Sequence, residues 1–230
     1  MNARFVHDSD PVLLVGGGKH RKRGFEQGRP FVRKIVAADS GADWLVKHDI
    51  TPEMVIGDFD SISPKVRFKL GPSRALLVNE QDTTDFEKCL SRIEAPLVIG
   101  VGFVGGRVDH QLASYHGLIR HADTRCILVG PQDLAFLAPR KLEIELPVGS
   151  RFSLFPFGAM HAQSQGLVWP VDAVDFAPGQ EIGTSNEVSG PVVLQCDAPK
   201  MLVILPLSAL AAAVGALDGA GEPWPARKEA

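Results

Sequence analysis

The first half of the chain alternates short apolar runs with segments of helical spacing. Runs rich in Val, Ile and Leu, each ended by glycine or a polar turn, predict strands at residues 11–15, 35–38, 54–56, 75–78, 97–101 and 127–129. Between them, apolar residues three or four apart predict helices at residues 42–48, 64–70, 86–93 and about 108–121. Strands that alternate with helices predict an α/β fold with a mostly parallel sheet and helices on both faces.

The pattern changes near residue 140. Beyond it, short apolar runs broken by Gly and Pro predict a small antiparallel β-sandwich, with strands at residues 142–146, 152–155, 192–194 and 201–205. A small alanine-rich helix is expected after the last strand, and residues 222–230 are expected to be frayed. We therefore expect an α/β domain over residues 1–140, a β-sandwich over residues 141–218 and a tail over residues 219–230.

Composition narrows the classes of function. The 230 residues carry a formal net charge of −3, which gives no basic face for a nucleic acid. The three cysteines lack the spacing of a disulfide framework or a zinc site, and residues 1–10 lack a secretion signal, so we expect a reducing, cytoplasmic location. The uncharged run between Lys200 and Asp218 is too short and too interrupted for a spanning helix, so no membrane anchor is expected.

The turn Gly57-Asp58-Phe59-Asp60 follows a buried apolar run and holds the strongest candidate chemistry. Asp58 and Asp60 are two residues apart, so they are expected to face one spot while Phe59 turns back toward the core. Two carboxylates at one spot repel each other unless a cation or a shared proton intervenes. Mg²⁺ is the simplest cation, because it takes one or two carboxylates plus phosphate oxygens. The alternative is a polar turn in which the aspartates only form the turn.

Other carboxylates occupy similar positions, after predicted strands or before predicted helices, where ligands bind in open α/β sheets. They are Asp39, Asp82, Asp85 and Asp109. If their loops converge, six carboxylates surround one crevice, an arrangement that is hard to stabilise without metal. The competing explanation is helix capping, since Thr84-x-x-Glu87 is a capping box and Asp109 could be an N-cap.

Basic residues near predicted turns offer groups for phosphate. Arg107, which follows two glycines, could neutralise phosphate charge in a transition state. His110 could carry a proton, although packing of its ring with a hydrogen bond to a carbonyl is the favoured alternative. The glycines at residues 16–18 could admit a phosphate that the basic residues 19–23 steer, or both could form a plain solvated loop.

Aromatic and polar residues stand out in the second half. Trp169, beside a proline, could stack on a flat cationic heterocycle, or could pack in the core or at a domain interface. Ser185 and Asn186 could contact ring nitrogens of such a ligand, or could simply make a turn.

Taken together, these motifs resemble the thiamine pyrophosphokinase (thiamine diphosphokinase) family. They occur in the family's order over about residues 12–205: Ala38-Asp39-x-Gly41-Ala42, Gly57-Asp58-Phe59-Asp60-Ser61, Asp82-x-Thr84-Asp85-Phe86, Gly105-Gly106-Arg107-x-Asp109-His110, Gly166-Leu167-x-Trp169 and Ser185-Asn186-Glu187. Two residues depart from the family pattern. Ser40 stands where the family usually has a second Gly, and Asp43 stands where it often has Asn.

The resemblance implies an enzyme that transfers the pyrophosphoryl group of ATP to the hydroxyl of thiamine and releases AMP. It also implies a homodimer in which thiamine binds where the sandwich of one subunit meets the α/β domain of the other. On this resemblance Asp58, Asp60 and Asp85 hold Mg²⁺, and Asp85 or Asp109 accepts the hydroxyl proton. Two alternatives remain open: a Mg²⁺-dependent transferase or phosphohydrolase for another substrate, and a non-catalytic nucleotide or thiamine sensor.

The resemblance also assigns each candidate residue to one side of the reaction. The acidic cluster for Mg²⁺ and ATP is Asp39, Asp58, Asp60, Asp85 and Asp109, and its neighbours are Gln81, Asp82 and Thr84. Arg107 is the expected phosphate contact. The residues on the thiamine side are Trp169, Ser185 and Asn186.

Overall fold

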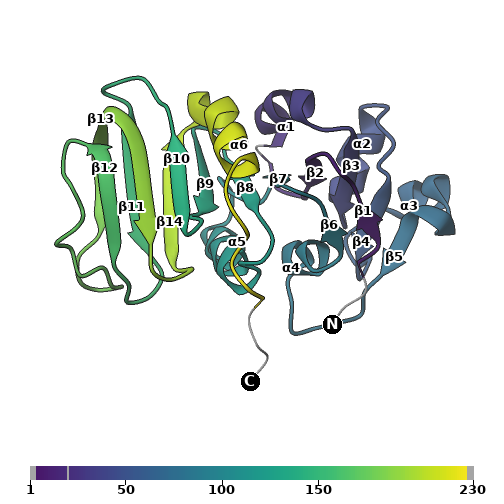
Figure 1. Cartoon of the computed structure of the whole chain (residues 1–230). Helices are drawn as coiled ribbons and strands as arrows, with labels where there is room; N and C mark the ends of the chain where they lie inside the picture. The colour runs from purple at the N-terminus through teal and green to yellow at the C-terminus, as the bar shows by residue number, and fades with distance from the viewer. Residues whose placement is uncertain (1–3, 20, 227–230) are drawn as a thin grey trace. The chain divides into compact units, whose positions relative to one another are not determined.

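The computed structural model describes residues 4–19 and 21–226, and the chain divides into two compact units (Figure 1). Unit 1 comprises Met1–Gly117 and Leu128–Pro131, and unit 2 comprises Leu118–Ile127 and Gln132–Ala230. Helix α5 (Val108–Arg120) and strand β8 (Cys126–Val129) contribute residues to both units. None of the described helices is long and apolar enough to cross a membrane.

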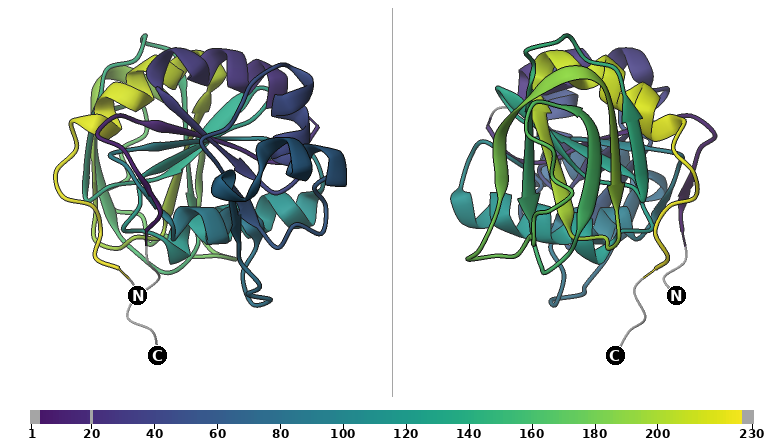
Figure 2. Two further views of the ribbon diagram at one scale, coloured as in Figure 1. Left: turned by 90° about the vertical axis from the view of Figure 1, so that its right-hand side faces the viewer. Right: turned by 60° about the vertical axis from the view of Figure 1, so that its left-hand side comes forward.

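Unit 1 is built on parallel strands, with α1 and α4 on opposite sides of them (Figures 1 and 2). Besides α5 and β8, its elements are β1 (Val6–His7), β2 (Val12–Val15), α1 (Arg21–Gly28), η1 (Arg29–Phe31), β3 (Lys34–Ala38), α2 (Gly41–Lys47), β4 (Met54–Gly57), α3 (Pro64–Leu70), η2 (Pro72–Arg74), β5 (Ala75–Leu77), α4 (Asp85–Leu90), β6 (Ile93–Glu94) and β7 (Val98–Val101). The strand order is β7-β2-β3-β4-β5. Strands β2 and β7 are buried along their whole length, which explains their continuous apolar runs.

Unit 2 is an antiparallel arrangement (Figure 2, right). Its elements are β9 (Asp133–Leu137), β10 (Lys141–Ile144), β11 (Arg151–Pro156), β12 (Ala162–Leu167), β13 (Gly183–Cys196), β14 (Met201–Pro206), η3 (Leu207–Ala209) and α6 (Leu210–Asp218). The order is β10-β13-β11-β14-β9, and β12 also pairs with β13. The long strand β13 therefore organises the unit: β11 pairs with its first part, and β10 and β12 both pair with its last part.

Two expectations for unit 1 are wrong. The alternative of a solvated loop at residues 19–23 is wrong for residues 21–23, which begin helix α1, and Arg21 Nη1 donates to the carbonyl oxygen of Gly17 at 2.6 Å. The helix that begins at Asp85 ends at Leu90, and Ile93 lies in strand β6, where it pairs with Val6. Ile93 was expected on the apolar face of a helix, and it is fully buried in the strand. Its apolar character therefore could not distinguish a helix from a strand.

Unit 2 differs from expectation at three points. Strands β9 and β12 were not foreseen, and the residues expected to form only a strand at 192–194 belong to the continuous 14-residue strand β13. The expected fraying of the tail is wrong at Trp224, which is 5% exposed. Its indole nitrogen donates to the carbonyl oxygen of Ala138 at 2.8 Å, and the guanidinium of Arg140 lies over its ring. Residues 227–230 lie outside the described residues.

Candidate active site

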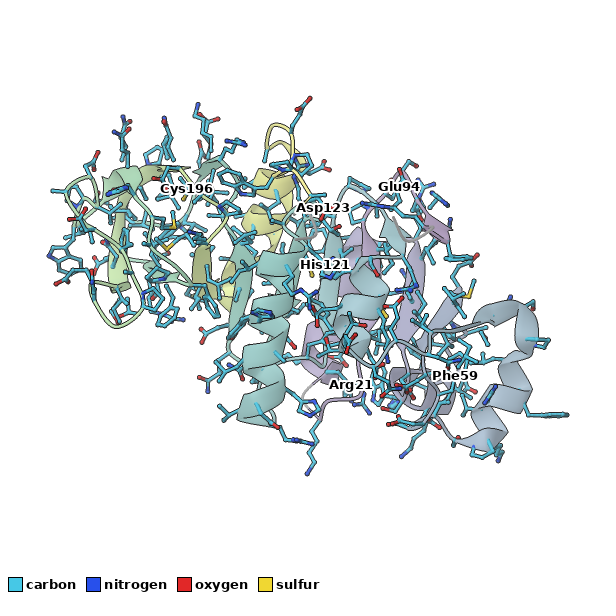
Figure 3. The ribbon with its side chains drawn as sticks, turned by 90° about the horizontal axis from the view of Figure 1, so that it is seen from below. Arg21, Phe59, Glu94, His121, Asp123 and Cys196 are labelled. Atoms are coloured by element: carbon cyan, nitrogen blue, oxygen red, sulfur yellow. The ribbon has the colours of Figure 1, made fainter. Side chains whose placement is uncertain are left out.

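Three aspartates of unit 1 converge where β3 and β4 end. Asp39 directly follows β3, and Asp58 and Asp60 lie in the turn after β4. One carboxylate oxygen from each of the three lies within 4.8 Å of the others. Phe59, labelled in Figure 3, is 9% exposed, and the guanidinium of Arg67 lies 5.0 Å from its ring centroid. The expectation that Asp58 and Asp60 share one spot while Phe59 packs inward is confirmed.

The backbone is unusual at this point. Asp39 has φ of 42° and Phe59 has φ of 64°, in the left-handed region that a bulky aromatic residue rarely adopts. Strained residues of this kind persist where the surrounding structure holds them, often at functional sites. Gly57 allows the close approach, because a Cβ there would lie 3.0 Å from the Cβ of Asp39. The absence of a Cβ at Gly57 therefore lets the end of β4 lie directly against Asp39 at the end of β3.

The carboxylate of Asp39 is buried without the hydrogen-bond donors that usually accompany a buried carboxylate. Its exposure is 2%, and neither of its oxygens receives a well-formed hydrogen bond from the part of the chain that the structure describes. Burial, followed by the charges of Asp85, Asp60 and Asp58, raises the pKa of Asp39 to about 6. A carboxylate in this position needs either a proton or a cation.

Lys88 is a buried charged residue beside the aspartates that sequence analysis missed. Its side chain is 3% exposed, and its Nζ donates to Asp58 Oδ2 at 2.8 Å and to Asp85 Oδ1 at 3.1 Å. Burial lowers the pKa of Lys88, but the bonds to the two carboxylates outweigh burial and leave the pKa above its ordinary value. The same contact with Lys88 lowers the pKa of Asp58.

The start of helix α4 fits its predicted capping pattern. Thr84 Oγ accepts from the amide of Glu87 at 3.3 Å, and a Glu87 oxygen accepts from the amide of Thr84 at 3.1 Å, so the capping box is confirmed. Asp85 lies in the first turn of the helix. Gln81 and Asp82 lie in the preceding loop, and both are exposed.

Arg107 and Asp109 lie at the start of α5 and bind each other. Their side chains are exposed, and Arg107 Nη2 donates to Asp109 Oδ2 at 2.5 Å. This pairing lowers the pKa of Asp109 to about 2. Helix α5 begins at Val108, so Asp109 lies inside the first turn and the N-cap alternative is wrong. His110 is exposed, so the expected packing of its ring is wrong as well.

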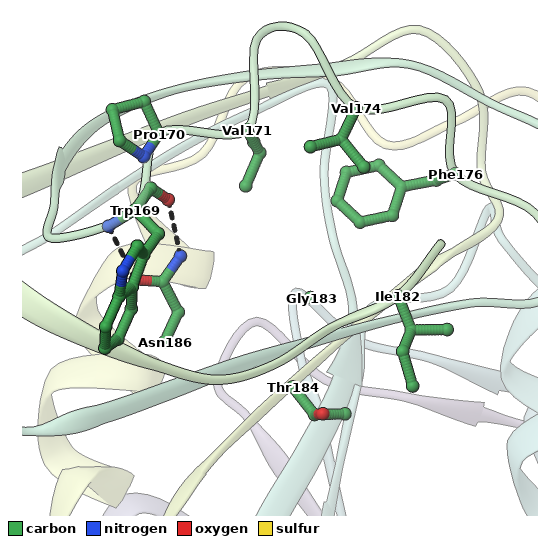
Figure 4. Close-up of a pocket in the computed structure, with 9 residues that line it drawn as sticks. All are labelled: Trp169, Pro170, Val171, Val174, Phe176, Ile182, Gly183, Thr184 and Asn186. Carbon is green, nitrogen blue, oxygen red and sulfur yellow. Dashed lines mark hydrogen bonds between the residues drawn. The ribbon is translucent and has the colours of Figure 1, made fainter. Parts of the chain in front are cut away.

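Trp169 and Asn186 form one side of a pocket of about 160 Å³ in unit 2 (Figure 4). Trp169 is 58% exposed, so its placement in the core is excluded. Asn186 is buried, and it clamps the backbone of Trp169 from both sides: its Nδ2 donates to the Trp169 carbonyl at 2.6 Å, and its Oδ1 accepts from the Trp169 amide at 3.2 Å. The indole is therefore held out toward solvent by a fixed backbone.

Ser185 lies beside this pocket-lining segment, inside strand β13. The alternative that Ser185 and Asn186 simply make a turn is therefore wrong. Ser185 has φ of 62°, and its amide donates to Ser153 Oγ at 3.0 Å. The register between β11 and β13 shifts at this point, which accounts for the local left-handed backbone.

Both halves of the chain match one protein family. Residues 31–129 match the family model for the thiamin pyrophosphokinase catalytic domain, and residues 141–201 match the model for the thiamin pyrophosphokinase vitamin B1 binding domain. Together the two matches cover more than half of the chain. The chain belongs to the thiamin pyrophosphokinase family.

Individual relatives agree with this assignment. Thiamine pyrophosphokinase 1 of Oryza sativa subsp. japonica is 34% identical over 161 residues, which cover 62% of this chain and 61% of the relative, less than two thirds of its length. The structure of thiamin pyrophosphokinase from Candida albicans superimposes with a TM-score of 0.71 at 17% identity, over 88% of this chain and 93% of that chain. The structure of thiamine pyrophosphokinase from Bacillus subtilis superimposes with a TM-score of 0.68 at 21% identity, over 85% of this chain and 98% of that chain. At these identities the two structures establish a shared fold.

The two departures from the family pattern both have a place in the structure. A Cβ on Gly17 would lie 2.4 Å from Ser40 Oγ, so Ser40 fits because residue 17 is glycine. Asp43 accepts a hydrogen bond from the amide of Ser63. Arg21 of the basic segment is partly buried against the carbonyl oxygens of Gly17 and Gly18, a contact that uses its guanidinium within the loop.

Proposed function

We propose that the protein is a thiamine diphosphokinase, which transfers the pyrophosphoryl group of ATP to the hydroxyl of thiamine and releases AMP. The observation that carries this proposal is the convergence of Asp39, Asp58 and Asp60, with Asp39 buried and short of hydrogen-bond donors among the described residues. The family matches support it, because the acidic cluster falls in the catalytic-domain match, and Trp169 and Asn186 fall in the vitamin B1 binding match.

The donor set fits Mg²⁺, a hard cation that binds carboxylate and phosphate oxygens. Its ligands are proposed to be Asp39, Asp58 and Asp60, which differs by one residue from the set Asp58, Asp60 and Asp85 that the sequence suggested. Bound Mg²⁺ supplies positive charge that offsets the charge of the ATP phosphates. The buried, donor-poor Asp39 supports its inclusion, and the contact of Asp85 with Lys88 supports a role beside the metal.

The other residues are proposed to position the substrates, since this type of transfer depends on positioning and charge neutralisation. Arg107 is proposed to exchange Asp109 for a phosphate oxygen and to shield developing charge. Asp85 is the better candidate to accept the thiamine proton, because burial raises its pKa whereas Arg107 lowers that of Asp109. Gln81, Asp82 and Thr84 are assigned to the ATP side of the reaction. Trp169, Ser185 and Asn186 are assigned to the thiamine side.

The same proposal extends to domains and assembly. Residues 1–140 are proposed to form the nucleotide-binding α/β domain, residues 141–218 a thiamine-binding β-sandwich, and residues 219–230 a tail. Parallel pairing of β2, β3 and β4 and antiparallel pairing of β10 with β13 support this division. The boundary between the compact units falls earlier, after Pro131, so that β9 belongs to unit 2. We also propose a homodimer that works in the cytoplasm, with ATP and thiamine as its ligands. Light scattering should then give twice the mass of one chain.

The test of the proposed function is AMP formation from ATP and Mg²⁺, with and without thiamine, with the thiamine product identified by mass. We expect AMP only with thiamine, in step with thiamine diphosphate. Inorganic phosphate in place of AMP would instead support a different phosphotransferase or phosphohydrolase. Binding of both ligands without turnover would support a sensor.

A further inference from the structure

Lys88 joins two chain segments that both carry proposed site carboxylates. Asp58 comes from the turn after β4, and Asp85 comes from the first turn of α4, one helical turn before Lys88. The ammonium lies between them, 2.8 Å from one carboxylate oxygen and 3.1 Å from the other. A buried lysine keeps its charge only when such partners compensate for the loss of water.

The position of Lys88 is itself held from behind. Arg92, which is 7% exposed, donates from Nη1 to the carbonyl of Lys88 at 3.1 Å and from Nη2 to Glu80 Oε1 at 2.5 Å. Glu80 belongs to the loop that leads into α4, and the capping box of Thr84 and Glu87 fixes the helix start. The ammonium therefore projects from a braced helix toward the acidic turn.

We propose that Lys88 is a positioning residue that holds Asp58 and Asp85 at a fixed separation by pairing with both carboxylates. Four carboxylates, those of Asp39, Asp58, Asp60 and Asp85, are close enough to influence one another. Lys88 supplies one built-in positive charge to this group. This inference rests on the proposed function for its catalytic part, but the pairing itself can be tested in the protein without metal or substrate.

The first experiment is a double-mutant cycle on metal-free protein. Lys88→Met keeps most of the apolar stem and removes the charge, and we expect it to lower Tm by about 3–8 °C. Adding Asp85→Asn should restore about half of that loss or more, because it removes the carboxylate left without its cation. Lys69→Met, on the exposed face of α3, is the matched control and should leave Tm within about 1 °C.

The cycle stays decisive if Lys88→Met does not fold. In that case the double variant Lys88→Met/Asp85→Asn should fold, since the repulsion is relieved. A double variant that is no more stable than Lys88→Met alone would overturn the inference and leave Lys88 with a packing role only.

The second experiment adds MgCl₂ without nucleotide and follows Tm. The rise in Tm should be larger for Lys88→Met than for the wild type, because more uncompensated carboxylate charge remains. Turnover of Lys88→Met should fall about 10-fold or more in kcat, with KM for thiamine changed by about 2-fold at most. If the wild type is active, and Lys88→Met shows the same Mg²⁺-induced rise in Tm and the same kcat as the wild type, the inference about Lys88 is overturned while the proposed function stands. A wild type without AMP formation, despite a positive cycle, would overturn the proposed function and the catalytic part together.

Discussion

The carboxylate of Asp43 accepts a hydrogen bond from the backbone amide of Ser63, which lies 3.1 Å from Oδ2. Asp43 lies in the first turn of α2, shortly after Asp39, and Ser63 is the N-cap of α3, shortly after Asp60. The bond therefore ties the segment that follows β3 to the segment that follows β4. These two segments carry the three converging aspartates, so the contact braces the site without taking part in it.

Two substitutions of Asp43 should show whether its hydrogen-bond acceptor or its negative charge matters for stability. Asn also offers an acceptor oxygen, so Asp43→Asn should keep the free energy of unfolding within about 0.5 kcal/mol. Asp43→Ala loses the acceptor and should lower the free energy of unfolding by about 1–2 kcal/mol and raise KM for ATP. Urea unfolding and AMP formation measure the two effects. Equal values for the Asn and Ala variants would contradict the bracing role.

Removal of one charge at the acidic cluster should stop turnover but leave the fold. Asp58→Asn keeps the size of the side chain, so we expect a native circular dichroism spectrum and a kcat reduced by about 100-fold or more. The matched control is Asp218→Asn, at an exposed position at the end of α6, which should match the wild type in both measurements. Near-wild-type turnover by folded Asp58→Asn would refute the metal assignment.

The raised pKa of Asp39 predicts a pH-dependent penalty in metal-free protein. Its pKa is about 6 in the fold against an ordinary value of 3.8, so the folded state favours the protonated form. The stability that this carboxyl contributes is present below its unfolded pKa and is lost as pH rises through its folded pKa. Asp39→Asn removes this titration, and Asn tolerates the left-handed backbone.

The stability of Asp39→Asn relative to the wild type should therefore increase between about pH 4 and pH 7, by up to about 3 kcal/mol. Urea unfolding in chelator at a series of pH values measures the difference. A difference that does not vary with pH would show that Asp39 ionises normally in the fold.

The clamp on Trp169 should control thiamine binding. Asn186→Ala removes both hydrogen bonds to the Trp169 backbone, so the indole loses its fixed position. We expect KM for thiamine to rise about 10-fold and KM for ATP to change by about 2-fold at most. Gln163→Ala, which removes an amide from an exposed position of β12, is the control. Equal changes in both KM values would indicate general destabilisation.

Local patterns predicted much of unit 1 and part of the site. The apolar runs that end in glycine or polar turns correspond to β2, β3, β4, β5, β7 and β8, because buried parallel strands leave a strong local signal. The two-residue spacing of Asp58 and Asp60 predicted their common direction for the same local reason. Helix α1 and strands β9 and β12 were missed. The polar sequence of α1 has few apolar positions, β12 is mostly polar or small, and β9 is a short run of five residues.

By itself, the sequence determined the alternation of strands and helices, the change of pattern near residue 140, the capping box and the family. All of these depend on residues close together in the chain or on the order of motifs. Only the tertiary structure placed Lys88 between Asp58 and Asp85, buried Asp39 and set the Asn186 clamp on Trp169. Lys88 and Asp58 are thirty residues apart, and in sequence Lys88 is one polar position of a short helix. Its role arises from the loss of water at a contact between distant segments, and local sequence does not encode that.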